Sequence, residues 1–252
     1  MSFGFKSINS DGIVQISDTE TNYCLLQRGT AVSVAPSAGN SLGLFPISFW
    51  NPTGIRPLLF VRYVSSTMRV FLHSMPGHEY AWLAVVPDVE GYPVAGQVIE
   101  WAVFVPANSL LMQYQNVSHG LRVWRSDGTL AFDSGRPPPQ IYSRSESTLA
   151  LESGSLNYPE YIPISVPDIG GSAPFVCMNQ FMGTTHFWQI TQYMYFLLRF
   201  SVQQMSSSQF RIGFVRGSDA ATVTLGIRRT TFENSPQTIS LLVAKINAAS
   251  AG

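Results

Sequence analysis

Charged side chains are scarce in this chain. Asp, Glu, Lys and Arg together make up 12% of the 252 residues, and fifteen basic residues balance fifteen acidic ones. An average soluble domain carries about twice that charged fraction. With no net charge, the chain has no field that would gather nucleic-acid phosphates, so we expect no nucleic-acid partner. An uncharged surface is more often covered by a protein partner than left in water, which favours a component of an assembly.

The groupings that mark common catalytic and cofactor sites are also lacking. The sequence has no Gly-rich phosphate loop, no His-Glu-x-x-His, no Gly-x-Ser-x-Gly and no cysteines at zinc spacing. We therefore expect no catalytic residue and no cofactor. His73, His78 and Glu79 form the one cluster with the composition of a metal site, but no third ligand is identifiable, so we expect no metal. Cys24 and Cys177 stand apart in the sequence and are expected to be buried free thiols.

Long hydrophobic runs are absent. The most apolar stretches, Ile99 to Val105 and Tyr193 to Phe200, are far shorter than the roughly 20 residues that cross a bilayer. We expect no transmembrane segment. The opening MSFGFKSINS has no basic region followed by an apolar run, so we expect synthesis and assembly in the cytosol.

The pattern of the remaining residues predicts an all-β fold. Hydrophobic residues make up 45% of the chain, β-branched and aromatic types are frequent, and Gly and Pro interrupt most windows of helical periodicity. Thr238 to Ile246 alternates well enough to be a last strand. Two hairpins are predicted near the start, one around Ser10-Asp11-Gly12 and one joining Leu58–Val64 to Met68–Leu72.

The two halves of the chain resemble each other. GFKSINSDGIVQI, from Gly4, aligns without gaps on GLRVWRSDGTLAF, from Gly120, at an offset of 120 − 4 = 116. Further along, LLFVRYVSSTMRVF resembles FLLRFSVQQMSSSQFRIGF, with Arg62 over Arg199 and Arg69 over Arg211. Hairpins can also converge on Ser-Asp-Gly because the turn demands it. We favour a duplication that gives two similar β-sandwich-like modules, residues 1–106 and 118–252, joined by a linker at 107–117.

The second module is longer because of a proline-rich insertion at residues 136–174, which holds seven of the sixteen prolines. Proline cannot donate to the interior of a sheet, so this stretch is expected to run over the surface. It is either a spacer or a docking arm. Four large apolar anchors favour the arm and are the candidate partner-binding residues: Tyr142, Tyr158, Tyr161 and Ile162.

The motifs GFKSINSDGIVQISDT and GLRVWRSDGTLAFDSG resemble a pattern found in tail-tip, baseplate and tail-fibre-associated proteins of long-tailed bacteriophages. The match covers about 17 residues in each half. It implies a non-enzymatic virion component, assembled in the host cytoplasm, that docks other tail proteins and forms a homo-oligomer around the tail axis. It also implies contact with a bacterial surface receptor.

The function favoured by these observations is structural, with two alternatives. A receptor-binding module of the tail would use exposed aromatic residues, and Trp50 and Tyr92 are the candidate contacts with a host glycan or protein. A glycan-degrading tail enzyme would need two carboxylates about 5–10 Å apart. Sequence alone does not place any two of the fifteen acidic residues at that separation.

Overall fold

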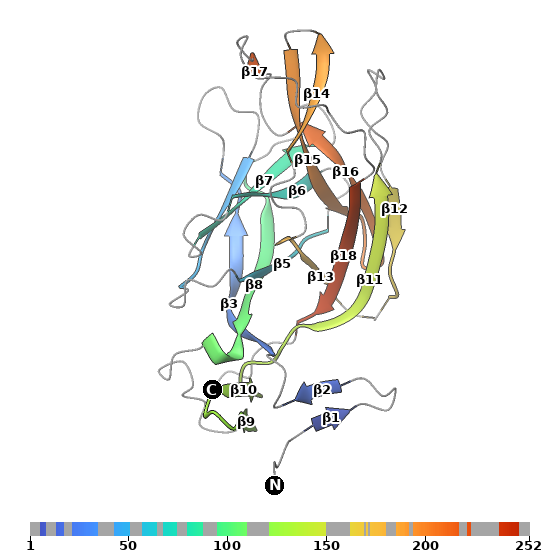
Figure 1. The fold of residues 1–252 in the computed structure, drawn as a ribbon. Helices are drawn as coiled ribbons and strands as arrows, with labels where there is room; N and C mark the ends of the chain where they lie inside the picture. Colours follow the sequence, from blue (N-terminus) through green and yellow to red (C-terminus); the bar gives the residue numbers. More distant parts are fainter. Residues whose placement is uncertain are drawn as a thin grey trace.

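In a computed structural model, the chain is all-β, as predicted, with antiparallel sheets and a single turn of 3-10 helix, η2 (Ala107–Ser109), among the residues described (Figure 1). The structure describes residues 6–8, 14–17, 22–34, 43–50, 57–64, 68–74, 80–87, 95–109, 121–149, 162–168, 170, 172–179, 185–191, 194–216, 221–222 and 237–246.

One layer is a six-stranded sheet in which strands of both halves of the chain are hydrogen-bonded side by side. In spatial order its strands are β11 (Gln140–Leu149), β18 (Gln237–Lys245), β13 (Phe175–Cys177), β5 (Leu58–Arg62), β8 (Val98–Pro106) and β3 (Tyr23–Val32). The last strand, β18, confirms the strand predicted for Thr238 to Ile246, with ends that differ by one residue.

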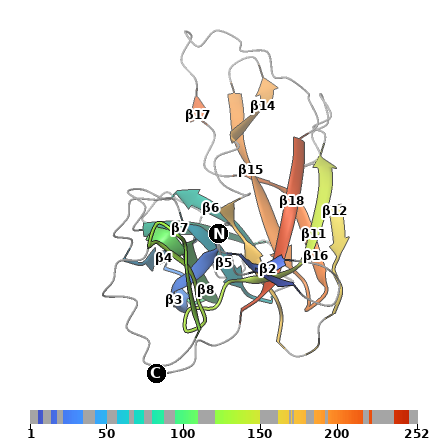
Figure 2. The same ribbon diagram turned by 60° about the horizontal axis from the view of Figure 1, so that its bottom comes forward.

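The facing layer is an eight-stranded sheet, again built by both halves (Figure 2). Its main path is β12 (Ile162–Ser165), β16 (Gln209–Arg216), β15 (Met194–Gln204), β6 (Met68–Ser74), β7 (Tyr80–Pro87) and β4 (Gly43–Ser48). Two further strands, β14 (Thr185–Thr191) and β17 (Ala221–Thr222), pair with β15.

The main core lies between the two sheets and results from the alternation of side chains along each strand. On β5, Leu59 and Val61 belong to this core, whereas Phe60 between them belongs to a second buried cluster on the other face of the six-stranded sheet. On β8, Val103 and Phe104 divide in the same way. Central strands buried on both faces read in the sequence as continuous apolar runs, as these do.

The two halves meet in both layers. In the six-stranded sheet β5 pairs with β13, with Val61 opposite Val176, and in the eight-stranded sheet β6 pairs with β15, with Val70 opposite Val202. The residues predicted as two modules therefore build one two-layer body.

Two small hairpins lie below the sandwich, and the first confirms the predicted pairing of the strands around Ser10-Asp11-Gly12, residues that themselves lie outside the described part of the chain (Figure 1). Strands β1 (Lys6–Ile8) and β2 (Val14–Ser17) form the first, and β9 (Arg122–Trp124) and β10 (Leu130–Asp133) form the second. In the second turn Gly128 has φ 83°, which only glycine adopts at little cost. Asp127 accepts hydrogen bonds from the hydroxyl and the backbone N–H of Thr129, which lower the pKa of its carboxyl group.

The hairpin predicted from Leu58–Val64 and Met68–Leu72 is wrong. Strand β5 lies in the six-stranded sheet and β6 in the eight-stranded sheet, so the chain passes from one layer to the other between these two strands. By contrast, β15 and β16 do form a hairpin within one sheet. The alignment of Arg62 with Arg199 is therefore wrong as well, because it equates a crossover with a hairpin.

The expectation that residues 136–174 form a surface insertion is also wrong in part. Nine residue pairs join β11 to β18, and four join β12 to β16. Both β11 and β12 are edge strands, and Pro163 is tolerated in β12 because an edge strand needs partners on one side only. Residues 150–161 of the predicted arm lie outside the described part of the chain.

Candidate assembly surface

The four edge strands of the sandwich carry the features by which natural sheets resist pairing with other chains. Such features are charged side chains and proline on the open edge. Exposed charges lie on β3 (Arg28) and on β11 (Arg144 and Glu146), and an exposed proline lies on β4 (Pro46) and on β12 (Pro163). At the end of β3, an isolated bridge between Val34 and Leu44 also draws the edges of the two layers together.

Strand β14 differs from these four edges. Its sequence, THFWQIT, contains no proline and no Asp, Glu, Lys or Arg. It belongs to a stretch without any charged residue between Asp168 and Arg199. In the described part of the chain β14 is paired with β15 and with no other strand, so its second edge carries none of the features listed for β3, β4, β11 and β12.

The β14–β15 hairpin extends past the end of the sandwich. Residues Leu198–Gln204 of β15 pair with β16 inside the eight-stranded sheet, whereas its first residues, from Met194 to Arg199, pair with β14. Figures 1 and 2 both show β14 and the start of β15 rising beyond β6 and β16. The register places Trp188 opposite Phe196 and Phe187 opposite Leu197.

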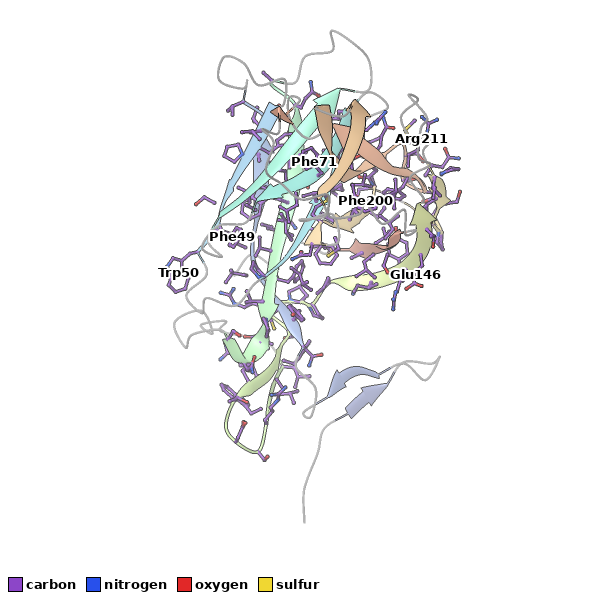
Figure 3. All side chains as sticks on the ribbon, turned by 45° about the horizontal axis from the view of Figure 1, so that its top comes forward. Phe49, Trp50, Phe71, Glu146, Phe200 and Arg211 are labelled. Carbon is purple, nitrogen blue, oxygen red and sulfur yellow. The ribbon has the colours of Figure 1, made fainter. Side chains whose placement is uncertain are left out.

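Trp50, one candidate receptor contact, is exposed. It follows β4, the residue is 42% exposed, and Figure 3 shows its side chain pointing away from the body, next to the buried Phe49. Its backbone N–H donates a hydrogen bond of 3.4 Å to Oε1 of Gln27 on β3, which links the two layers at this edge. The other candidate, Tyr92, lies outside the described residues.

Two of the four predicted partner-binding residues are described, and both contribute to the fold itself. Tyr142 and Ile162 are half-buried and pack against the main core. Burial, with a smaller contribution from Asp168, raises the pKa of Tyr142. Tyr158 and Tyr161 lie outside the described residues, so the docking arm stays a prediction.

Two amide side chains, the buried Gln204 and the half-buried Asn179, connect the halves across the seam, where β5 pairs with β13 and β6 pairs with β15. Gln204 accepts a hydrogen bond from the backbone N–H of Tyr63 at 3.0 Å and donates one to the backbone oxygen of Pro174 at 2.9 Å. Asn179 accepts from Leu59 N–H at 2.7 Å and donates to the oxygen of Pro57 at 2.8 Å. Each amide therefore satisfies two backbone groups that would otherwise be costly to bury.

The side chain of Arg62 also connects the two halves, on the outer face of the six-stranded sheet. Arg62 forms an ion pair with Glu100 on the neighbouring strand β8. Its guanidinium carbon lies 4.7 Å from the ring centroid of Phe175, and Nη1 donates to Ser172 Oγ at 2.8 Å. Glu100 is in the first half and Phe175 and Ser172 are in the second, so these contacts cross between halves.

The two cysteines are buried and free, as predicted. Cys24 is on β3 and Cys177 is on β13, and two strands of the same sheet separate them. Burial raises the pKa of Cys24 to about 12 and that of Cys177 to about 11, so both thiols are protonated and unreactive near neutral pH.

No group of three or more His, Cys, Asp or Glu side chains in the described residues could hold a metal ion. His78 and Glu79 of the weak sequence cluster fall outside them. No described helix is long and apolar enough to cross a membrane.

Comparison with protein-family models, with curated proteins and with solved structures finds no match to this chain.

The edge of β14 was not singled out from the sequence. The charge-free stretch that contains it is nevertheless visible there.

Proposed function

We propose that this chain is a non-enzymatic structural protein that assembles with other protein chains by strand addition along β14. The observation that carries the proposal is the contrast between edges: β3, β4, β11 and β12 bear charge or proline, and β14 bears neither. An unprotected edge is a template for the strand of another chain, whose backbone bonds supply affinity. A two-stranded hairpin is marginal in water, so the hairpin also gains stability from such a partner.

The assembly we propose is the tail tip, baseplate or tail-fibre region of a long-tailed bacteriophage. The two Ser-Asp-Gly hairpins support it, because each has the pattern that resembles proteins of that class. The chain would then be part of the virion tail, assembled in the host cytoplasm, with other tail proteins as its partners. Copies around the tail axis would form a homo-oligomer.

The test is a charge placed on the unprotected edge. Gln189→Lys on β14 introduces the kind of residue that natural edges use against pairing, and Gln189 is already polar, so folding should not suffer. We expect self-association of the full chain, measured by analytical ultracentrifugation, to weaken by about tenfold or more, equivalent to about 1.4 kcal/mol. Thr30→Lys on the charged edge β3 is the matched control and should leave association unchanged.

The wild-type chain is measured over the same concentration range, alone and with purified tails. A wild-type monomer that binds no tail would contradict the structural role. If Gln189→Lys associates as strongly as the wild type, the chain does not assemble through β14, although the assembly role itself would stand.

The exposure of Trp50 supports a second candidate function, recognition of a receptor on the host surface. Trp50 is 42% exposed, and an exposed flat indole ring can stack on a sugar or on a protein side chain. Trp50→Ala should then reduce adsorption of particles to host cells, and Tyr92→Ala tests the other candidate contact. Trp124→Ala is the matched control, because Trp124 is 44% accessible and lies on the β9–β10 hairpin. Equal adsorption of all three variants would remove both residues as contacts.

A further inference from the structure

The two small hairpins have the same register, residue for residue. Every paired residue of the first hairpin becomes a paired residue of the second when 116 is added to its number, as in 122 − 6 = 116. The three pairs of the first hairpin are Lys6–Ser17, Ser7–Ile16 and Ile8–Val14, and those of the second are Arg122–Asp133, Val123–Phe132 and Trp124–Leu130. Gln15 and Ala131, which the pairing skips, are also 116 apart.

The same offset relates the edge strands β3 and β11. The register of β3 on β8 shifts between Leu25 and Gln27, and the register of β11 on β18 shifts between Ile141 and Ser143. The bulged residues are therefore Leu26 and Tyr142, again 142 − 26 = 116 apart, and both pack against the main core. Sandwich architecture does not dictate where an edge strand bulges, and bulges behave as inherited features of a fold.

The next edge strands agree in sequence and burial. Pro46-Ile47-Ser48 on β4 recurs as Pro163-Ile164-Ser165 on β12, at an offset of 163 − 46 = 117. In both triplets the isoleucine is buried and its neighbours are exposed. Ile47 lies opposite Ala81, and Ile164 lies opposite Phe210. This triplet was not recognised from the sequence because three residues are too short a match to notice alone.

The whole strand order repeats as well. The first half contributes β3-β8-β5 to one sheet and β4-β7-β6 to the other, and the second half contributes β11-β18-β13 and β12-β16-β15. Taken in chain order, each strand of the first half has a counterpart in the same sheet and at the same distance from the seam. Both seam pairs, β5–β13 and β6–β15, are antiparallel, as a two-fold axis between equivalent strands requires.

We infer that the chain is a fused dimer, in which two copies of one β-module pair edge to edge across a pseudo-two-fold axis. In each module the edges of β5 and β6, or of their counterparts β13 and β15, form the interaction surface, and the partner of that surface is the other copy of the module. This inference is independent of the proposed assembly role, since it concerns the seam and not β14.

The seam has diverged so that each half fits the other and not itself. Asn179 corresponds to Arg62 at an offset of 117. The amide of Asn179 binds backbone groups on one side of the axis, whereas Arg62 forms an ion pair on the other side. Because the two equivalent positions carry different contacts, each half fits the other half better than it would fit a copy of itself.

The test uses distances between spin labels on the full chain. Thr30, Ser48, Glu146 and Ser165 are exposed, and in the fused dimer Glu146 is the counterpart of Thr30 and Ser165 that of Ser48. The native cysteines are buried, so cysteines introduced at these positions are labelled selectively. We expect equal distances in two double variants that cross the axis, Thr30→Cys/Ser165→Cys and Ser48→Cys/Glu146→Cys, because a two-fold rotation exchanges them.

Two further variants report on each half separately. Thr30→Cys/Ser48→Cys and Glu146→Cys/Ser165→Cys should also give equal distances if the halves are copies. Unequal distances within the halves would overturn the duplication. Equal distances within the halves but unequal distances across them would overturn the two-fold axis. Arg28 and Arg144, also exposed and 116 apart, replace Thr30 and Glu146 if a labelled variant fails to fold.

Discussion

The amides of Gln204 and Asn179 bind backbone groups across the seam between the halves, and Gln204→Leu measures what the buried one of the two contributes to stability. Leucine has a similar volume, so the substitution removes two hydrogen bonds without opening a large cavity. The N–H of Tyr63 and the oxygen of Pro174 would then be buried without their partner. Each unsatisfied group costs about 1–3 kcal/mol, so we expect the free energy of unfolding to fall by roughly 2–6 kcal/mol.

The assay is reversible denaturation by urea, followed by tryptophan fluorescence, with thermal melting as a second measurement. For a chain of this size each kcal/mol lowers the Tm by about 2–4 °C, so a loss of 3 kcal/mol corresponds to roughly 6–12 °C. Gln27→Leu is the matched control, because Gln27 is exposed and the bond that its side chain accepts from Trp50 N–H is long at 3.4 Å. We expect that control to change stability by no more than about 0.5 kcal/mol.

Gln204→Glu separates the hydrogen bonds from the packing. At neutral pH the carboxylate keeps an acceptor for Tyr63 but loses the donor to Pro174, and burial disfavours its charge. Burial raises the pKa of a carboxyl group, so the protonated form, which can donate, is favoured in the folded state. The variant should therefore recover stability as the pH falls. If Gln204→Leu unfolds at the same urea concentration as Gln27→Leu, the amide does not stabilise the seam and the reasoning fails.

Two further changes test the packing and the buried thiols. Gly29→Ala should lower the free energy of unfolding by roughly 1–3 kcal/mol, because the added Cβ would lie 2.8 Å from Cζ2 of Trp101. Thr30→Ala on the same strand is the control and should not lower it. Chemical denaturation measures both variants, and equal stability of the two would contradict the close contact. The raised pKa values of Cys24 and Cys177, about 12 and 11, favour the neutral thiols of the folded state. Their contribution to the free energy of unfolding is complete below the unfolded pKa of about 9, and it is lost as the pH rises from there through the folded pKa values. At pH 10 the two thiols together should have lost roughly 3 kcal/mol of that contribution. Denaturation in reductant between pH 7 and 10 should show this slope in the wild type and not in the double alanine variant, and equal slopes would contradict burial as the cause.

The local structure could be predicted from the sequence where turn residues, or the alternation of apolar and polar residues along a strand, determined it. Ser126-Asp127-Gly128 requires a tight turn, and the structure has one with Gly128 at positive φ. The alternation of β18 identified the last strand. These features depend on residues close together in the chain, so the sequence contains all the information that they need.

The pairing of strands could not be predicted in the same way. Val61 lies opposite Val176, and nothing in either apolar run specifies a partner 115 residues away. The polar bend after β5 looks the same whether the chain turns back in one sheet or crosses to the other layer. The edge position of β11 and β12, which makes the prolines around them acceptable, follows from that pairing and was therefore missed.

The differences between the halves indicate where the chain has acquired separate roles. Trp50 is exposed two residues beyond β4, and its counterpart beyond β12 is Pro167, also exposed, at an offset of 117. A receptor recognised through Trp50 would thus be bound once per chain, in spite of the two-fold arrangement that we infer. In the described residues, β14 and β17 have no counterpart in the first half. Avidity for a host surface would then require several chains, and the unprotected edge of β14 is the feature through which the chain would gather them.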